Sequence, residues 1–93
     1  MDTPLPPTPA TPTRIVLIGR APGNDILLGS PGVSARHARV LVEPGRLVLE
    51  DLGSRNGTFV GVPPRRIERA EITLADQVTF GDTPLPPSAL ADL

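Results

Sequence analysis

Hydrophobic residues along this 93-residue chain come in short runs that are separated by polar, glycine- and proline-containing turns. The run RIVLIG at 14–19 is apolar and β-branched, and HARVLVE at 37–43 alternates, with Ala38, Val40 and Val42 on one face. Runs of this kind predict strands at 14–19, 25–28, 37–43, 46–52, 57–61, 65–74 and 77–81. Apart from a weak pattern near 67–74, no window of about eleven residues shows a helical stripe.

Turn residues join these runs at short intervals. Pro44 and Gly45 fit a tight turn, which predicts a hairpin between the strands at 37–43 and 46–52. The residues LADQ at 74–77 form a second tight turn, which we expect to join neighbouring strands. Many short strands with Gly, Pro and Asn turns predict an all-β fold, a small β-sandwich of short antiparallel strands.

The two ends of the chain differ from this pattern. Residues 1–13 are mostly proline and threonine, and residues 83–93 also contain several prolines. Such segments favour extended chain and have little to bury. We therefore expect a proline- and threonine-rich tail at 1–13, a folded domain at 14–82 and a proline-containing C-terminal segment at 83–93.

Composition narrows the possible functions. The net charge is −1 and only 2% of residues are aromatic, which disfavours nucleic acid and anionic membranes as partners. The absence of cysteine and the presence of one histidine exclude a disulfide framework and a Cys- or His-rich metal centre. No run approaches the ~18 apolar residues of a membrane span, and no signal peptide is evident, so we expect a cytoplasmic domain without a cofactor.

Polar residues gather in the turns that flank the predicted hairpin. They are Arg20 after the first strand, Ser34 and Arg36 before the hairpin, and Ser54, Arg55 and Asn56 after it. Loops at one edge of a sandwich form a surface held by a rigid frame. Guanidinium groups and a hydroxyl there would give charge-assisted bonds to an anion, and an asparagine amide can donate and accept at once. The set suits a phosphate attached to an extended peptide.

The order of these residues resembles the forkhead-associated (FHA) domain family over about residues 15–81. The matches are Gly19-Arg20, Asn24-Asp25, Ser34-x-x-His37, Ser54-x-Asn56-Gly57-Thr58, and finally Leu74, Asp76 and Phe80-Gly81. One pair alone would be weak, whereas the ordered set is specific. The resemblance implies a β-sandwich that binds phosphothreonine peptides.

The resemblance also implies a role for each matched residue. Arg20 matches the arginine that grips the phosphate, and Ser34 matches the serine whose hydroxyl and backbone N–H bind it. Asn56 matches the asparagine that holds the peptide main chain, and Arg55 lies where the family often has a side chain near the phosphate. Arg36 follows Ala35, which replaces the usual basic residue, and we count Arg36 among the expected binding residues. Three residues match structural positions: Gly19, His37 and Gly57.

The chain departs from the family at its N-terminal side. Family members have about two more strands before the Gly-Arg pair, whereas only 18 residues precede Gly19. Pro84, Pro86 and Pro87 would remove ladder donors from a last strand. We therefore expect a trimmed or irregular outer sheet, completed by the proline-rich ends or by another chain. An exposed edge would allow a homodimer by edge-strand pairing or strand exchange.

Together these features predict a phosphothreonine-peptide-binding interaction module that acts downstream of a serine/threonine kinase. Its partner would be a phosphothreonine-containing protein, such as that kinase or a substrate of it. The same fold leaves open a phosphate-independent scaffolding or oligomerisation domain. A hydrolase that uses Ser34 and His37 is a further interpretation, but no acidic partner is evident and three-residue spacing in one loop rarely places a hydroxyl on an imidazole. We therefore expect no enzymatic activity.

Overall fold

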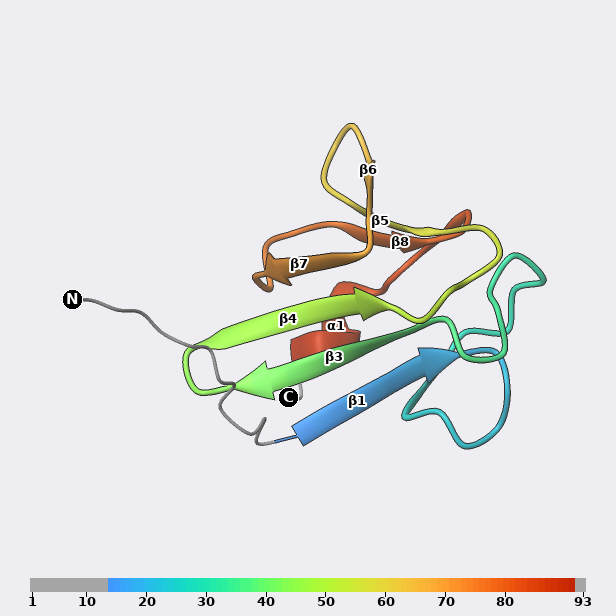
Figure 1. Ribbon diagram of the computed structural model, residues 1–93, viewed down its shortest axis with the longest axis horizontal. Coiled ribbons are helices and arrows are strands. Elements are labelled where there is room, and N and C mark those ends of the chain that lie inside the picture. The colour runs from blue at the N-terminus through green and yellow to red at the C-terminus, as the bar shows by residue number, and fades with distance from the viewer. Residues whose placement is uncertain (1–13, 92–93) are drawn as a thin grey trace.

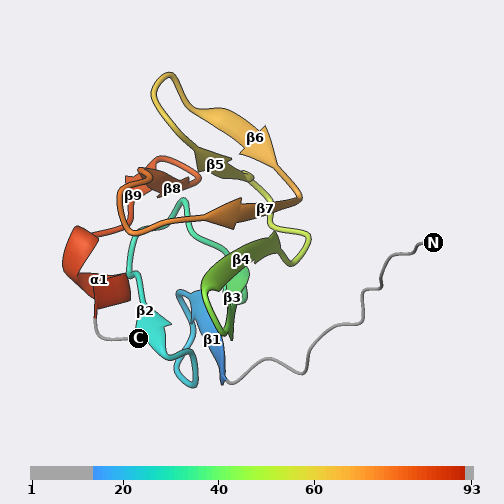
Figure 2. The same ribbon diagram turned by 90° about the vertical axis from the view of Figure 1, so that its left-hand side faces the viewer.

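The computed structural model describes residues 14–91, so the tail expected at 1–13 lies outside the described residues. The elements are β1 Arg14–Gly19, β2 Ile26–Leu27, β3 Ala38–Glu43, β4 Arg46–Asp51, β5 Thr58–Val60, β6 Arg65–Ile67, β7 Arg69–Ile72, β8 Val78–Phe80, β9 Thr83–Pro84 and α1 Pro87–Ala91. A five-stranded sheet has the order β2-β1-β3-β4-β7, and a four-stranded sheet has the order β6-β5-β8-β9 (Figures 1 and 2). The predicted β-sandwich is confirmed, and β1–β2 is its one parallel pair among these residues.

The core lies between the two sheets and comes from alternate positions of the strands. Val16 and Ile18 of β1 and Val40 of β3 are fully buried, as is Phe80 of β8 in the other sheet. The Phe80 ring packs edge-on against His37, with ring centroids 5.3 Å apart and an interplanar angle of 78°. This is a favourable aromatic geometry, and it anchors the loop that carries His37 to the centre of the core.

The predicted hairpin between the strands at 37–43 and 46–52 is confirmed. β3 and β4 pair antiparallel with Glu43 opposite Arg46, and the turn residues Pro44 and Gly45 connect them. Gly45 has φ +76°, a left-handed conformation that glycine adopts without steric cost. This hairpin forms the middle of the five-stranded sheet.

The prediction of one strand at 65–74 is wrong, because the segment forms β6 and β7 in different sheets. β6 pairs with β5, whereas β7 pairs with β4, and the chain breaks between them at Glu68. Ile67 and Ile72 are five positions apart, so in one continuous strand they would point to opposite faces. Both contact the core, and the break makes this possible.

The prediction that the turn at 74–77 joins neighbouring strands is also wrong in one respect. It is a tight turn, in which the Thr73 N–H donates to Asp76 Oδ2 at 2.7 Å and the Asp76 N–H donates to the Thr73 carbonyl at 3.1 Å. However, it joins β7 to β8, which lie in different sheets and do not pair with each other. The turn is therefore a connection between the layers of the sandwich rather than a hairpin.

The core continues past residue 82. Leu85 and Leu90 are buried and belong to the core cluster, and α1, which follows β9, lies at one side of the sandwich (Figure 2). The Leu85 N–H donates to the Val78 carbonyl at 2.8 Å, so the adjacent Pro84 turns its nitrogen away from β8 toward the outer edge. Proline therefore removes no ladder donor here. The C-terminal segment completes the outer sheet as a short edge strand, and Pro84 leaves that edge poorly suited to further pairing.

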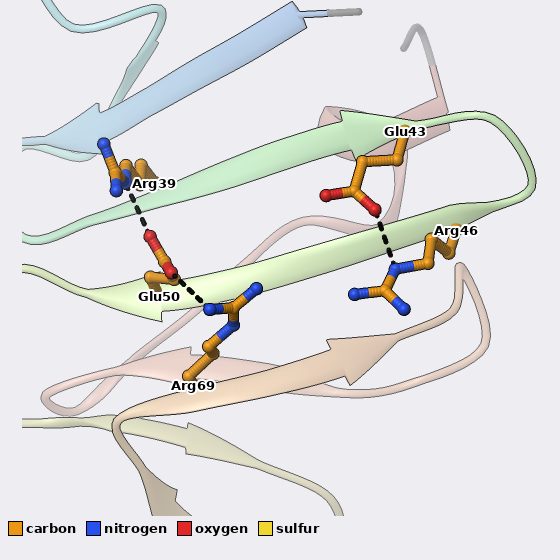
Figure 3. Close-up of polar contacts among 5 residues, drawn as sticks. All are labelled: Arg39, Glu43, Arg46, Glu50 and Arg69. Carbon is orange, nitrogen blue, oxygen red and sulfur yellow. Dashed lines mark hydrogen bonds and ion pairs between the residues drawn. The ribbon is translucent and has the colours of Figure 1, made fainter. Parts of the chain in front are cut away.

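Ion pairs cover the outer face of the five-stranded sheet (Figure 3). Glu50 of β4 lies between Arg39 of β3 at 2.7 Å and Arg69 of β7 at 3.5 Å. Arg46 contacts Glu43 at 2.8 Å and also approaches Glu71 of β7. Exposed pairs of this kind add little stability, but they neutralise the arginines of this face. No helix within residues 14–91 is long and apolar enough to span a membrane.

Candidate functional site

Three loops meet at the end of the sandwich opposite the β3–β4 turn (Figure 1). The β1–β2 loop joins the β2–β3 loop through the Arg20 N–H, which donates to the Ser34 carbonyl at 3.0 Å. The β4–β5 loop joins it through the Arg55 N–H, which donates to Ser34 Oγ at 3.0 Å, and through Asn56 Nδ2, which donates to the Gly32 carbonyl at 2.8 Å. Residues that are far apart in the sequence therefore share one edge.

A hollow of about 230 Å³ lies among these loops. Its walls are Arg20, Pro31, Gly32, Val33, Ser34, Ala35, Arg55 and Asn56. Four of the five expected binding residues therefore line it, whereas Arg36 is exposed and does not. The lining is mainly polar, and it suits an anion held on backbone and side-chain donors better than an apolar ligand.

Arg20 is exposed but held in place. Its Nε donates to the Val33 carbonyl at 3.0 Å, which fixes the plane of the guanidinium against the β2–β3 loop. The two terminal nitrogens of this side chain have no partner among residues 14–91. An arginine that is oriented through Nε keeps the other side of its fork for a bidentate contact.

Ser34 links the three loops, but its backbone N–H has a different partner from the one that the resemblance implies. Its N–H donates to His37 Nδ1 at 3.1 Å and is therefore not available to a phosphate. Its Oγ accepts the Arg55 N–H, which leaves the hydroxyl proton free to donate. The neighbouring Ala35 lines the hollow, and its backbone N–H has no acceptor among the described residues, which makes it a candidate donor that side-chain reasoning could not find.

His37 is fully buried, and both of its ring nitrogens bond to the backbone. Nδ1 accepts the Ser34 N–H, so the proton resides on Nε2, which donates to the Gly57 carbonyl at 2.8 Å. The ring thereby ties the β2–β3 loop to the β4–β5 loop. Because neither nitrogen faces the Ser34 hydroxyl, the geometry argues against a hydrolase built on these two residues.

Asn56 and Arg55 project from the β4–β5 loop at the rim of the hollow. The bond to Gly32 fixes the amide of Asn56 and leaves one N–H and the amide oxygen for a ligand. Arg55 is held through its backbone, and its exposed guanidinium has no partner among residues 14–91. Both residues can therefore contact a bound peptide without losing a contact of the fold.

Asp51 at the end of β4 organises this loop, and the sequence analysis did not single it out. Its Oδ2 accepts the N–H groups of Gly53 and Ser54 at 2.9 and 3.0 Å, and its Oδ1 accepts the hydroxyls of Ser54 and Thr58. Burial acts to raise the pKa of Asp51, but the hydrogen bonds from Ser54, Thr58 and Gly53 outweigh it and lower the pKa below its ordinary value. The D-x-x-S spacing, typical of a side chain that caps a turn, is the signal that could have identified it.

Gly19 and Asn24 brace the β2–β3 loop from the side of β1. A Cβ at position 19 would lie 2.2 Å from the Ala35 carbonyl oxygen, so only glycine permits this close approach. Asn24 Nδ2 donates to the carbonyls of Ala21 and Ala35, at 2.8 Å each. The Gly-Arg and Asn-Asp pairs of the sequence therefore act together on the loop that carries Ser34.

The arginines of the sheet face differ from the two arginines at the hollow in their partners. Arg39, Arg46 and Arg69 are paired with carboxylates on the sheet face, as Figure 3 shows. Arg20 and Arg55 at the hollow form no ion pair with any of residues 14–91. The described residues also contain no cluster of three His, Asp or Glu that could hold a metal ion. The guanidinium groups of Arg20 and Arg55 therefore lie at the hollow without a carboxylate partner among the described residues.

Comparison with known proteins agrees with this geometry. The family model described as "FHA domain" matches residues 16–81. FhaB of Mycobacterium tuberculosis, an FHA domain-containing protein, is 40% identical over 66 residues, which are 71% of this chain and 38% of FhaB. The glycogen accumulation regulator GarA of Mycolicibacterium smegmatis is 40% identical over 63 residues, which are 68% of this chain and 39% of GarA.

A solved structure is also similar to this chain in its fold. Mycobacterium tuberculosis EmbR in complex with a low affinity phosphopeptide superimposes with a TM-score of 0.69 at 32% identity, covering 75% of this chain and 18% of EmbR. The chain spans about two fifths of the length of the curated relatives named above. The match is therefore to one domain of these proteins.

Proposed function

Since this chain belongs to the FHA-domain family, we propose that it is a protein-interaction module that binds phosphothreonine peptides at the hollow between its loops. The observation that carries the proposal is the set of unpaired donors around one small polar hollow. They are the terminal nitrogens of Arg20, the hydroxyl proton of Ser34 and the backbone N–H of Ala35. A phosphate offers three oxygen acceptors, so this set can satisfy it from several sides.

The peptide main chain lies beside the phosphate in this proposal. Asn56 keeps one amide N–H and its amide oxygen free, which is the combination needed to clasp a peptide bond. Arg55 adds a second guanidinium next to the phosphate. The loops are held by Asp51 and His37 before any ligand arrives, so binding costs little ordering of the protein.

Charge-assisted hydrogen bonds account for the dependence on phosphate. Each contributes roughly 1.5–3 kcal/mol, and a dissociation constant on the order of 1 μM corresponds to about −8.2 kcal/mol. Two or three such bonds therefore supply much of the binding free energy. An unphosphorylated threonine offers these donors only a neutral hydroxyl, and we expect it to bind far more weakly.

The requirement for phosphothreonine places the chain downstream of a serine/threonine kinase. Its partner is then that kinase, phosphorylated on threonine, or one of its substrates. GarA is named as a regulator, and the solved structure of EmbR is a complex with a low affinity phosphopeptide, which supports a regulatory role of this kind for the present chain. No catalytic step is part of the proposal.

The test is calorimetric titration with paired phosphorylated and unphosphorylated threonine peptides. We expect Arg20→Ala to weaken phosphopeptide binding at least about 10-fold, since one charge-assisted contact is lost. Arg39→Ala is the matched control, because Arg39 is an arginine of the ion-paired sheet face. Equal binding of Arg20→Ala and wild type would refute the proposal, and equal binding of the two peptides would favour phosphate-independent scaffolding.

A further inference from the structure

The turn between β8 and β9 packs against two residues that line the same hollow, Gly32 and Asn56. A Cβ built on Gly81 would lie 2.5 Å from the Gly32 carbonyl oxygen and 3.3 Å from Asn56 Cβ. A Cβ built on Gly32 would lie 2.6 Å from Asp82 Oδ1. Gly32 and Asn56 both line the hollow, so the carboxylate of Asp82 lies directly beside its wall.

Asp82 is exposed and has no basic partner among residues 14–91. Its one hydrogen bond within this range comes from the Thr83 hydroxyl at 3.2 Å. The other carboxylates are mostly in use. Asp25, Asp51 and Asp76 accept backbone N–H groups, and Glu43, Glu50 and Glu71 pair with arginines. Among the carboxylates of residues 14–91, only Asp82 and Glu68, which lies between β6 and β7, have neither an arginine partner nor a bond from a backbone N–H.

The two sides of the hollow therefore carry opposite charges. Arg20 and Arg55 make the phosphate side of the hollow positive, whereas Asp82 makes the side behind Gly32 negative. A peptide bound through its phosphate and clasped by Asn56 would carry one of its flanking residues past that carboxylate. An opposite charge there gains Coulomb energy, and a like charge loses it.

We propose that Asp82 is a specificity-determining residue, and that it selects phosphothreonine peptides with an arginine or lysine a few residues to one side of the phosphothreonine. This inference rests on the proposed phosphopeptide function and concerns the same site. The preferred ligand thus combines a phosphate for Arg20 with a basic side chain for Asp82. A peptide with an acidic residue at that position is disfavoured.

The experiment uses a phosphothreonine peptide with a neutral background, in which Arg, Ala or Glu replaces each flanking residue in turn. At low ionic strength we expect one position, on one side only, at which Arg binds roughly 5- to 10-fold more tightly than Glu. The difference should shrink as salt is added, because exposed charges are screened. A flat profile across all positions would overturn the proposal.

Variants of the protein assign the effect to Asp82. Asp82→Asn should reduce the preference for Arg over Glu to less than about twofold, and Asp82→Lys should reverse it. Glu68→Gln removes one negative charge elsewhere and should keep the preference. If Asp82→Asn keeps the preference, Asp82 does not set it. Thermal melting should show Asp82→Asn as stable as wild type, since the side chain is exposed.

The neutral phosphopeptide separates this inference from the proposed function. If that peptide binds and Arg and Glu make no difference at any position, the function stands and the role of Asp82 is refuted. If no phosphothreonine peptide binds, the proposed function fails, and the role of Asp82 fails with it.

Discussion

Replacing Asp51 with alanine should both destabilise the domain and weaken phosphopeptide binding. The carboxylate accepts hydrogen bonds from two backbone N–H groups and two hydroxyls, and one of these hydroxyls belongs to Thr58, which is fully buried. Alanine would leave the Thr58 hydroxyl without this acceptor and would release the turn that follows β4. That turn positions Arg55 and Asn56 at the hollow.

The expected cost follows from the four hydrogen bonds. Each contributes roughly 1 kcal/mol net, and bonds to a charged acceptor contribute more, but Asp51 is only half-buried and the bonds to Gly53 and Ser54 are local. We therefore expect a loss of about 2–3 kcal/mol in the free energy of unfolding. For a domain of this size, whose stability is about 0.05–0.15 kcal/mol per residue, that is a large share.

Urea denaturation at neutral pH measures this loss, and Asp51→Asn is the matched variant. The asparagine oxygen can accept both backbone N–H groups, while its NH₂ can donate to the oxygens of Ser54 and Thr58 if these hydroxyls reorient. We expect Asp51→Asn to lose about 1 kcal/mol, less than the alanine variant. Equal stability of Asp51→Ala and wild type would show that the carboxylate does not hold the loop.

The pH dependence gives a second measurement of the same residue. The pKa of Asp51 is lower in the folded chain than in the unfolded one, so its contribution is fully present above the unfolded value, near ~3.9. It is lost as the pH falls through the folded value. The stability advantage of wild type over Asp51→Asn should therefore shrink on acidification; an advantage that grows at low pH would contradict this reasoning.

Further substitutions test the packing and the ligand. Gly19→Ala should cost about 1–3 kcal/mol in urea unfolding and also weaken phosphopeptide binding, because its Cβ meets the Ala35 carbonyl; Gly29→Ala, which adds a Cβ in open space, should do neither. Leu85→Ala should cost about 2–4 kcal/mol if the C-terminal segment belongs to the core, whereas exposed Leu74→Ala should cost little. Phosphothreonine peptides should bind several-fold more tightly than matched phosphoserine peptides in calorimetry, since one methyl in a pocket is worth about 1–3 kcal/mol; equal affinities would exclude such a pocket.

Local features of the sequence determined much of this structure. Alternation over 37–43 and the Pro-Gly turn predicted the central hairpin, and the apolar runs other than 65–74 predicted strands close to their observed bounds. The ordered pairs beginning with Gly19-Arg20 placed the polar residues in loops between these strands. These signals are readable because strand alternation and turn chemistry act between residues a few positions apart.

Contacts between distant segments decided the rest. The sequence could not show that Ile67 and Ile72 enter one core from two sheets, or that Leu85 belongs to that core. Nor could it show that His37 takes the Ser34 N–H, or that Asp82 lies beside the hollow. Hydrophobic burial and hydrogen-bond satisfaction depend on which surfaces meet, and that is fixed only when the two sheets pack together and bring their loops to a common edge.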